Sequence, residues 1–224
     1  GQVWKETDSD TAHFNKNVAN TVTLTTAVVA NGLSFQNGRV TFSGSGSPSL
    51  TIGAGGVTFT NAGSVGGDTS FGSTLGTITL SASQVWANNG QNAYTVAAGV
   101  KGADASAVIW TLGNQSGFTN SFSGIIANGA SAGTLALTVN NPGAGIHNIS
   151  GTANTYSGKT TVERGILQIA SLRNVGGGAS SLGAVTTVSD GTIDLGSGSN
   201  TASLIYNGSG ASTSDRVINL AGSS

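Results

Sequence analysis

Apolar and polar positions alternate in short blocks along this chain of 224 residues. One form recurs: an apolar residue, then Thr, then a second apolar residue, and late copies carry Asp or Asn in the middle. Side chains alternate between the two faces of a strand, so each block predicts a short, half-buried strand with Thr mostly outward and Val, Ile, Leu and Phe inward. The blocks are residues 22–24, 40–42, 50–52, 57–59, 78–80, 137–139, 193–195 and 218–220.

The residues between the blocks are Asn-Gly, Gly-Gly, Asp-Gly and Ser-Gly steps, which tolerate left-handed backbone. In a parallel β-solenoid such steps form corners, whereas in an antiparallel sandwich they form hairpin turns. We expect an all-β chain that forms one solenoid over residues 1–224, with coils of about 20 residues, roughly ten turns and a length on the order of 50 Å. An antiparallel sandwich stays open for roughly the first 60 residues, where LSFQNGRVTF (33–42) resembles a hairpin.

The composition indicates a folded chain with few charged residues. Only 8% of residues are charged, 37% are hydrophobic, and the formal net charge is -1. Disordered chains are usually richer in charge and poorer in apolar residues. The few basic residues are scattered, which argues against nucleic acid as a partner. No apolar run approaches the roughly 20 residues of a membrane helix, so we expect no membrane insertion by this segment.

The segment ANTYSGKT (153–160) matches a relaxed phosphate-loop pattern that ends in Gly158, Lys159 and Thr160. A phosphate loop needs a helix directly after it, because the helix N-terminus faces the phosphates. The next residues, TVERGILQIA, instead predict strand, turn and strand. We therefore interpret the segment as structural and expect no nucleotide or other cofactor.

Residues 151–170, GTANTYSGKTTVERGILQIA, closely resemble the autotransporter-associated β-strand repeat, also called the passenger-associated transport repeat. Lys159 stands where the family commonly has Gly, and Arg164 and Ile166 are mild departures. Residues 21–44, 49–63 and 181–200 resemble the repeat's flanking segments more loosely. The positions that fall on the family pattern are Asn154, Thr155, Tyr156, Ser157, Gly158, Thr160, Val162, Gly165 and Leu167.

The resemblance implies a right-handed parallel β-helix that a bacterium exports and displays at its surface, often within a very long repetitive polypeptide. In that family the repeat is tied to secretion and folding of the passenger and not to catalysis. We accordingly expect this chain to be a segment of a longer protein. Its last residues, VINLAGSS, also end within a strand pattern.

Catalytic patterns are weak. Residues 129–133 fit the Gly-x-Ser-x-Gly elbow, but a strand pattern follows them, and His147 is the only downstream His, so we predict a loop. Asp190 and Asp194 could serve a polysaccharide-cutting site, which needs several converging carboxylates. We instead interpret Asp190 as a corner residue and Asp194 as an outward strand residue. We expect no catalytic residue and no enzymatic activity.

The residues that could bind a metal ion or a sugar are also better explained by structural roles. Asp8-Ser9-Asp10 lacks the rest of a calcium loop, and His13 and His147 are far apart in sequence, so we expect no metal site. Trp86 and Trp110 end strand-like blocks, which favours core positions over a sugar-stacking platform. Asparagines are expected to stack as a ladder inside or along the coil, including Asn15, Asn20, Asn31, Asn37 and later ones.

The function expected from these patterns is a non-enzymatic structural module of a bacterial cell-surface or extracellular protein, adhesin-like or fibre-forming. The alternative is a carbohydrate-binding or polysaccharide-degrading β-helix, with surface glycans as partners. Residues 1–20 are expected to cap one end of the coil or dock onto a neighbouring copy. The final block lacks charged or proline blockers, which predicts end-to-end self-association or continuation into further repeats.

Overall fold

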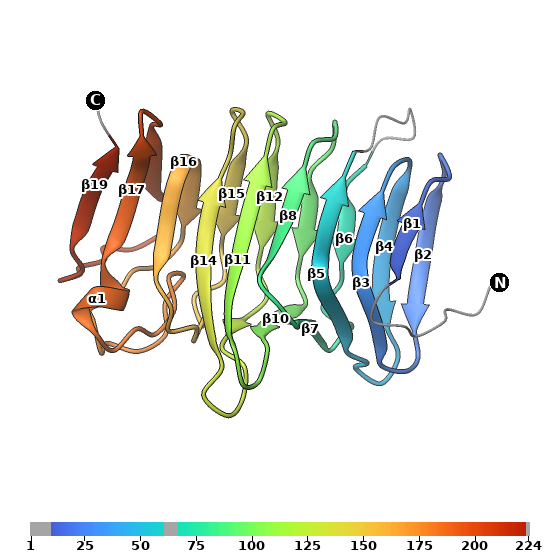
Figure 1. The fold of residues 1–224 in the computed structure, drawn as a ribbon, viewed down its shortest axis with the longest axis horizontal. Helices are drawn as coiled ribbons and strands as arrows, with labels where there is room; N and C mark the ends of the chain where they lie inside the picture. The colour runs from blue at the N-terminus through green and yellow to red at the C-terminus, as the bar shows by residue number, and fades with distance from the viewer. Residues whose placement is uncertain (1–9, 61–66, 223–224) are drawn as a thin grey trace.

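The computed structural model describes residues 10–60 and 67–222. The chain winds into a right-handed parallel β-solenoid of about 8 turns, with 52% of the described residues in strands and 2% in helix (Figure 1). Strands β5, β8, β11 and β14 follow one another along the near side, and β6, β12 and β15 lie behind them. The predicted fold class is confirmed.

The described residues contain short strands and a single helical turn. The strands are β1 (Thr11–Phe14), β2 (Ala19–Leu24), β3 (Val28–Phe35), β4 (Arg39–Gly44), β5 (Leu50–Phe59), β6 (Thr69–Phe71), β7 (Thr77–Leu80), β8 (Gln84–Asn88), β9 (Tyr94–Val96), β10 (Gly99–Gly102), β11 (Ala107–Asn114), β12 (Thr119–Phe122), β13 (Ile126–Ala127), β14 (Thr134–Asn140), β15 (Ile146–Ile149), β16 (Thr160–Ile169), β17 (Ile193–Gly198), β18 (Ala202–Tyr206) and β19 (Ile218–Gly222), and the helical turn is α1 (Val188–Gly191).

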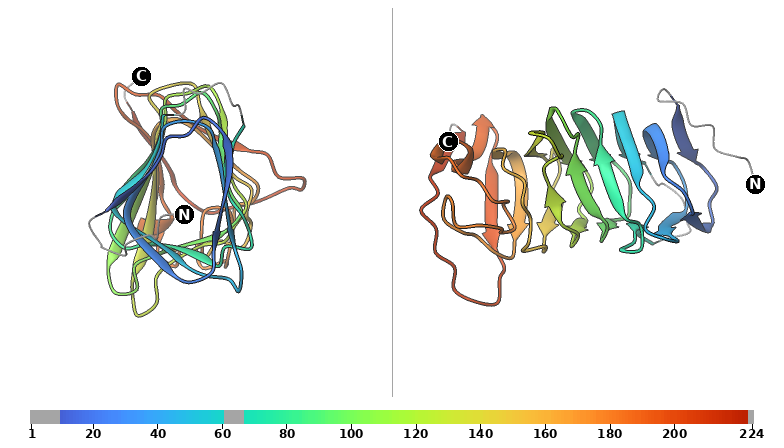
Figure 2. Two further views of the ribbon diagram at one scale, coloured as in Figure 1. Left: turned by 90° about the vertical axis from the view of Figure 1, so that its right-hand side faces the viewer. Right: turned by 90° about the horizontal axis from the view of Figure 1, so that it is seen from below.

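Each complete coil has three sides, seen along the axis in Figure 2. Side one carries the short strands β7, β10 and β13; side two carries β8, β11 and β14; side three carries β9, β12 and β15. Long strands bend around a corner and serve two sides. The first half of β16 pairs with β17 on side two, and its second half pairs with β18 on side three.

The paired strands of residues 10–60 are parallel, so the antiparallel alternative is wrong there. β3 pairs with β1 and β5, whereas β4 pairs with β2 and β6. The segment 33–42 is therefore a corner and not a hairpin. Gly38 turns this corner with a φ of +71°, a conformation that favours glycine.

The coils are longer and fewer than the sequence predicted. Thr11 pairs with Gly32, 21 positions on, but Thr160 pairs with Ile193, 33 positions on. The expected ten turns are therefore about 8, and the stack is on the order of 40 Å long at about 4.8 Å per coil. The expectation failed because apolar blocks mark the sides of a coil, while the corner loops between them vary in length.

The core follows the predicted alternation. In blocks such as 40–42, 50–52 and 78–80 both apolar residues are buried and the central Thr is partly exposed. Aromatic rings fill the first coils: Phe14, Phe35, Phe59 and Tyr94 form a continuous stack with successive centroid distances of 4.9, 5.0 and 4.3 Å.

Trp86 and Trp110 are completely buried, and their ring centroids lie 5.0 Å apart. The predicted core position of both tryptophans is confirmed. Neither ring is accessible as a platform for a sugar.

A column of buried asparagines lines the corner between sides two and three. Asn88, Asn114 and Asn141 each donate from Nδ2 to the backbone carbonyl of the residue four positions later, at 2.9, 2.8 and 2.9 Å. The predicted ladder thus forms from later asparagines. Of the early ones, Asn15 and Asn20 are exposed.

Candidate functional site

The residues that match the transport-repeat pattern build one complete coil. Residues 154–156 lie on side one, where Thr155 donates its backbone N–H to Ile126 of the preceding coil at 2.8 Å. The two halves of β16 then supply sides two and three. Residues 154–169 of this chain therefore span all three sides of a single coil.

Asn154 connects three successive coils. Its side chain is completely buried. Oδ1 accepts the backbone N–H of Ile126 at 2.9 Å, and Nδ2 donates to the carbonyl of Ser181 at 2.9 Å. Because a buried backbone group without a partner is costly, this one side chain stabilises the coil before it and the coil after it.

Tyr156 and Thr160 link sides one and two of the same coil. Both are buried, and their hydroxyl groups lie 2.9 Å apart. Burial raises the pKa of Tyr156 to about 12, although the contact with Thr160 acts in the opposite direction. Thr160 is thus an inward threonine, unlike the central threonines of the repeated blocks.

Ser157 and Gly158 fit against the preceding coil. Asn128 accepts the Ser157 N–H at its Oδ1 (3.0 Å) and donates from Nδ2 to the Ser157 hydroxyl (2.8 Å). A Cβ on Gly158 would lie 2.5 Å from the carbonyl oxygen of Leu135, so only glycine allows this approach.

The remaining pattern residues form the corner and the core. Gly165 has a φ of +89°, and a Cβ there would lie 2.4 Å from that of Asn141 in the ladder. Val162 and Leu167 are completely buried. Thr155 is the exposed member of the set. The nine residues thus occupy structural positions in the coil.

Lys159 is not part of a phosphate loop. The strand β16 begins at the next residue, and Lys159 forms an ion pair with Asp194 at 2.5 Å on the outer surface. Asp194 also accepts a hydrogen bond from Asn219 at 2.9 Å. Partial burial opposes ionisation of Asp194, but the contacts with Lys159 and Asn219 outweigh it and lower its pKa. Asp194 is an outward strand residue, as predicted.

Asp190 lies in the helical turn α1, which directly precedes β17. Its N–H is accepted by the Thr187 hydroxyl at 3.1 Å, and that hydroxyl donates to Asp190 Oδ2 at 2.7 Å. This reciprocal pair caps the helical turn.

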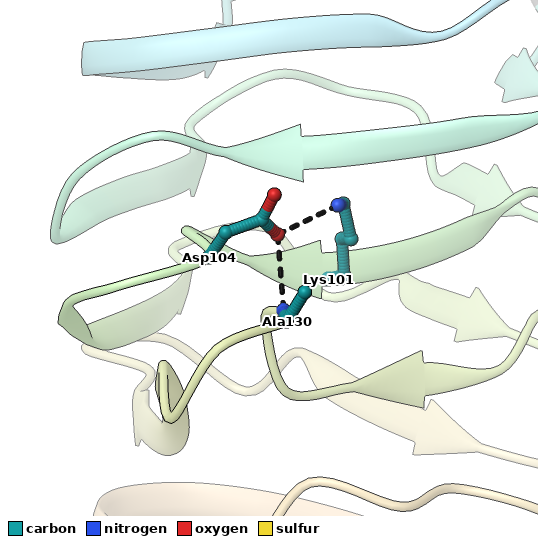
Figure 3. A network of polar contacts seen from close by, with 3 residues as sticks. All are labelled: Lys101, Asp104 and Ala130. Atoms are coloured by element: carbon teal, nitrogen blue, oxygen red, sulfur yellow. Dashed lines mark hydrogen bonds and ion pairs between the residues drawn. The ribbon is translucent and has the colours of Figure 1, made fainter.

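Residues 129–133 form a loop, as predicted, and strand β14 follows it. Asp104 holds this loop by accepting the Ala130 N–H at 3.0 Å, while Lys101 donates to the same carboxylate oxygen at 2.8 Å (Figure 3). The hydrogen bonds from Lys101 and Ala130 lower the pKa of Asp104. Ser131 is exposed, whereas His147 is completely buried in β15, so the two cannot form a catalytic pair.

Metal-ligating groups are dispersed in the described part of the chain. No cluster of three or more His, Cys, Asp or Glu residues suited to a metal ion occurs among residues 10–60 and 67–222. His13 is exposed on β1, while burial lowers the pKa of His147 to about 3. Asp8 and Ser9 of the proposed turn lie outside the described residues.

The last coil has an open apolar edge. Ile218 and Leu220 are in register with Ile193 and Leu195 of the coil before them. Ile193 is completely buried, but Ile218 is 52% and Leu220 77% exposed. Within the described residues, β19 pairs with β17 alone. We call Val217, Ile218 and Leu220 the terminal edge.

The N-terminal segment is described only in part. Residues 1–9 of the predicted cap or docking segment (1–20) lie outside the described residues. Residues 11–14 and 19–24 are strands β1 and β2 of the first coil.

Comparison of the chain with protein-family models, with curated proteins and with solved structures gives no match. In the described residues, no helix has the length and apolar character needed to cross a membrane.

The sequence predicted an open strand edge at the final block, and the structure adds that Ile218 and Leu220 are the exposed apolar residues of that edge. The block 218–220 carried the signal for a strand. Its exposure depends on whether another coil covers it, and no pattern within the block encodes that.

Proposed function

We propose that this chain is a non-enzymatic structural module of a bacterial cell-surface or extracellular protein, adhesin-like or fibre-forming. Its solenoid joins a further coil at the terminal edge, so that segments form a longer rod. The observation that carries this proposal is the exposure of Ile218 and Leu220 at positions whose counterparts one coil earlier face the core.

The terminal edge exposes apolar side chains that a further coil would bury. Fully burying an Ile or Leu side chain is worth about 1.5–3 kcal/mol, so covering these side chains stabilises a junction by several kcal/mol. The outer backbone groups of β19 are also available to a parallel strand. Residues 217–222 contain no charged residue and no proline to block such pairing.

The charged groups support a structural role. Asp194 contacts Lys159, Asp104 contacts Lys101, and Asp190 contacts Thr187. These carboxylates stabilise local structure in three different places. A glycosidase would need two carboxylates facing one cleft.

The assignment to the bacterial surface rests on the resemblance of residues 151–170 to the transport repeat. The buried Asn154 and the close approach at Gly158 give physical reasons for that pattern within a solenoid.

The test is the assembly state of the purified chain over a range of concentrations, measured by light scattering and electron microscopy. We expect end-to-end oligomers or filaments, because each chain presents an open edge. The double variant Ile218→Lys/Leu220→Lys should abolish them. The control is Ile109→Lys, because Ile109 is 50% exposed on the side of the rod.

A stable monomer at all concentrations would contradict end-to-end joining, as would filaments that persist in the double variant. The enzymatic rival has its own test. Turnover of pectin or alginate that is lost in Asp190→Asn or Asp194→Asn would replace the structural role with catalysis.

A further inference from the structure

An open pocket of about 410 Å³ lies between two loops of the C-terminal coils. The loop after β16 contributes Arg173 and Asn174, and the loop after β18 contributes Ser212 and Thr213. Tyr206, at the end of β18, lines the same space. Its volume is in the range of small-molecule sites. We call it the Tyr206 pocket.

The two loops are held together before any ligand binds. Four hydrogen bonds cross between them: Ser212 Oγ to the carbonyl of Leu172 (2.5 Å), Ser214 Oγ to the carbonyl of Arg173 (3.0 Å), Asp215 N to Asn174 Oδ1 (3.1 Å) and Val175 N to Asp215 Oδ1 (2.8 Å). A wall fixed in this way loses little conformational entropy on binding.

A buried arginine supports the pocket from inside. Arg216 is 7% exposed, and its guanidinium donates to the carbonyls of Arg173 (3.0 Å), Leu182 (2.8 Å) and Gly183 (3.3 Å). The contact with the Arg173 carbonyl fixes the backbone that carries the Arg173 side chain.

Tyr206 lines the pocket with a partly exposed side chain. Its side chain is 42% exposed, and its hydroxyl already donates to the carbonyl of Gly210 at 2.5 Å. A partly exposed aromatic ring whose hydroxyl group is already hydrogen-bonded offers apolar surface to a ligand.

Arg173 and Asn174 supply the polar contacts. Arg173 is exposed, and its guanidinium makes no hydrogen bond or ion pair within the described residues. Asn174 uses Oδ1 to hold Asp215, which leaves its amide N–H groups for a ligand. The charged groups of these loops are Arg173, Arg216 and Asp215, so the local formal charge is positive and favours an anion.

We propose that the Tyr206 pocket binds a saccharide unit that carries a carboxylate. The apolar face of the sugar ring packs on Tyr206, the carboxylate pairs with the Arg173 guanidinium, and hydroxyl groups bond to Asn174 and Thr213. A simple anion would need the arginine alone. The exposed ring beside it favours a ligand with both a carboxylate and an apolar face.

This site is separate from the proposed end-to-end joining. None of the residues of the terminal edge lines the pocket. Substitutions at Ile218 and Leu220 therefore test assembly, and substitutions at Tyr206 and Arg173 test ligand binding, so that either proposal can fail alone.

The experiment titrates the full chain with D-glucuronate, D-glucose and acetate and follows binding by ligand-observed NMR. We expect glucuronate to bind at least tenfold more tightly than either other compound. Arg173→Gln should weaken binding about tenfold, because it removes a charge-assisted contact. Tyr206→Ala should do the same by removing the ring, while Tyr206→Phe should keep most of the affinity.

The matched control is Arg39→Gln, an exposed arginine near the other end of the rod, which should bind glucuronate like the unaltered chain. Thermal melting checks that each variant is folded; if Tyr206→Ala unfolds, Arg173→Gln and the acetate comparison decide. The proposal is overturned if glucuronate does not bind, if glucose or acetate binds equally well, or if Arg173→Gln has no effect.

Discussion

The hydroxyl groups of Tyr156 and Thr160 lie 2.9 Å apart inside one coil, and each is the polar partner of the other. Tyr156→Phe should therefore lower the free energy of unfolding by about 1–2 kcal/mol, because it leaves the buried Thr160 hydroxyl without this partner. Denaturant unfolding measures the change.

The double variant Tyr156→Phe/Thr160→Val should lose less than the sum of the two single variants, because it removes both polar groups. Thr161→Val, at a partly exposed threonine of the same strand, is the control and should have little effect. Strictly additive losses would show that the two hydroxyls are not coupled.

Asn154→Ala should lower the free energy of unfolding by more than Tyr156→Phe does. It removes the partners of the Ile126 N–H and the Ser181 carbonyl in two neighbouring coils. Each unsatisfied buried group costs about 1–3 kcal/mol, so for the two groups we expect a loss of roughly 2–6 kcal/mol in chemical denaturation. The exposed Asn207, replaced by Ala, serves as control. Equal stability of the two variants would contradict the linking role of Asn154.

His147 predicts acid sensitivity. Burial lowers its pKa to about 3 in the folded chain, from an ordinary 6.5. Between these values the unfolded chain binds the proton and the folded chain does not, so stability falls as the pH drops through this window. The slope contributed by one such group is about 1.4 kcal/mol per pH unit.

His147→Leu should flatten this acid branch, because Leu cannot be protonated and Leu167 already occupies the same register in the next coil. His13→Leu, at an exposed histidine, is the control. Melting temperatures between pH 7 and 4 measure both variants. An unchanged pH profile in His147→Leu would rule out this residue as the cause.

Ala132 has a φ of +71°, which is unfavourable for a residue with a Cβ. Ala132→Gly should therefore raise the free energy of unfolding by about 0.5–1 kcal/mol, after the greater freedom of glycine in the unfolded chain is counted. Ala130→Gly in the same loop should instead lower it slightly. Thermal unfolding compares them, and a destabilised Ala132→Gly would contradict the assigned backbone.

The sequence predicted the strands and their buried faces, because alternation is local: Val40 and Phe42 are buried on either side of Thr41. It did not predict which strands pair. The coil of Thr160 and the coil of Thr11 differ by 12 residues, and this difference depends on corner loops without a repeating pattern.

The same limit applies to the candidate sites. The ladder positions Asn88, Asn114 and Asn141 become recognisable only when the coils are in register. The pattern at 154–167 could be assigned to a coil because Asn154, Gly158 and Gly165 each meet a steric or hydrogen-bonding requirement of that coil. The Tyr206 pocket could not be predicted from the sequence, because it lies between two loops that are distant in sequence, one with Arg173 and one with Thr213.

The aromatic stack makes the N-terminal end of the rod different from the C-terminal end. Rings contact one another continuously from Phe14 in the first coil to Phe122, whereas the buried residues of β16 and β17 are mainly aliphatic. Each coil of a solenoid is stabilised chiefly by its immediate neighbours. We therefore expect the local stability to be higher in the aromatic N-terminal coils than in the aliphatic C-terminal coils. Amide exchange should begin at β19 and advance toward the aromatic coils, which makes the N-terminal half the last part of the rod to lose its shape.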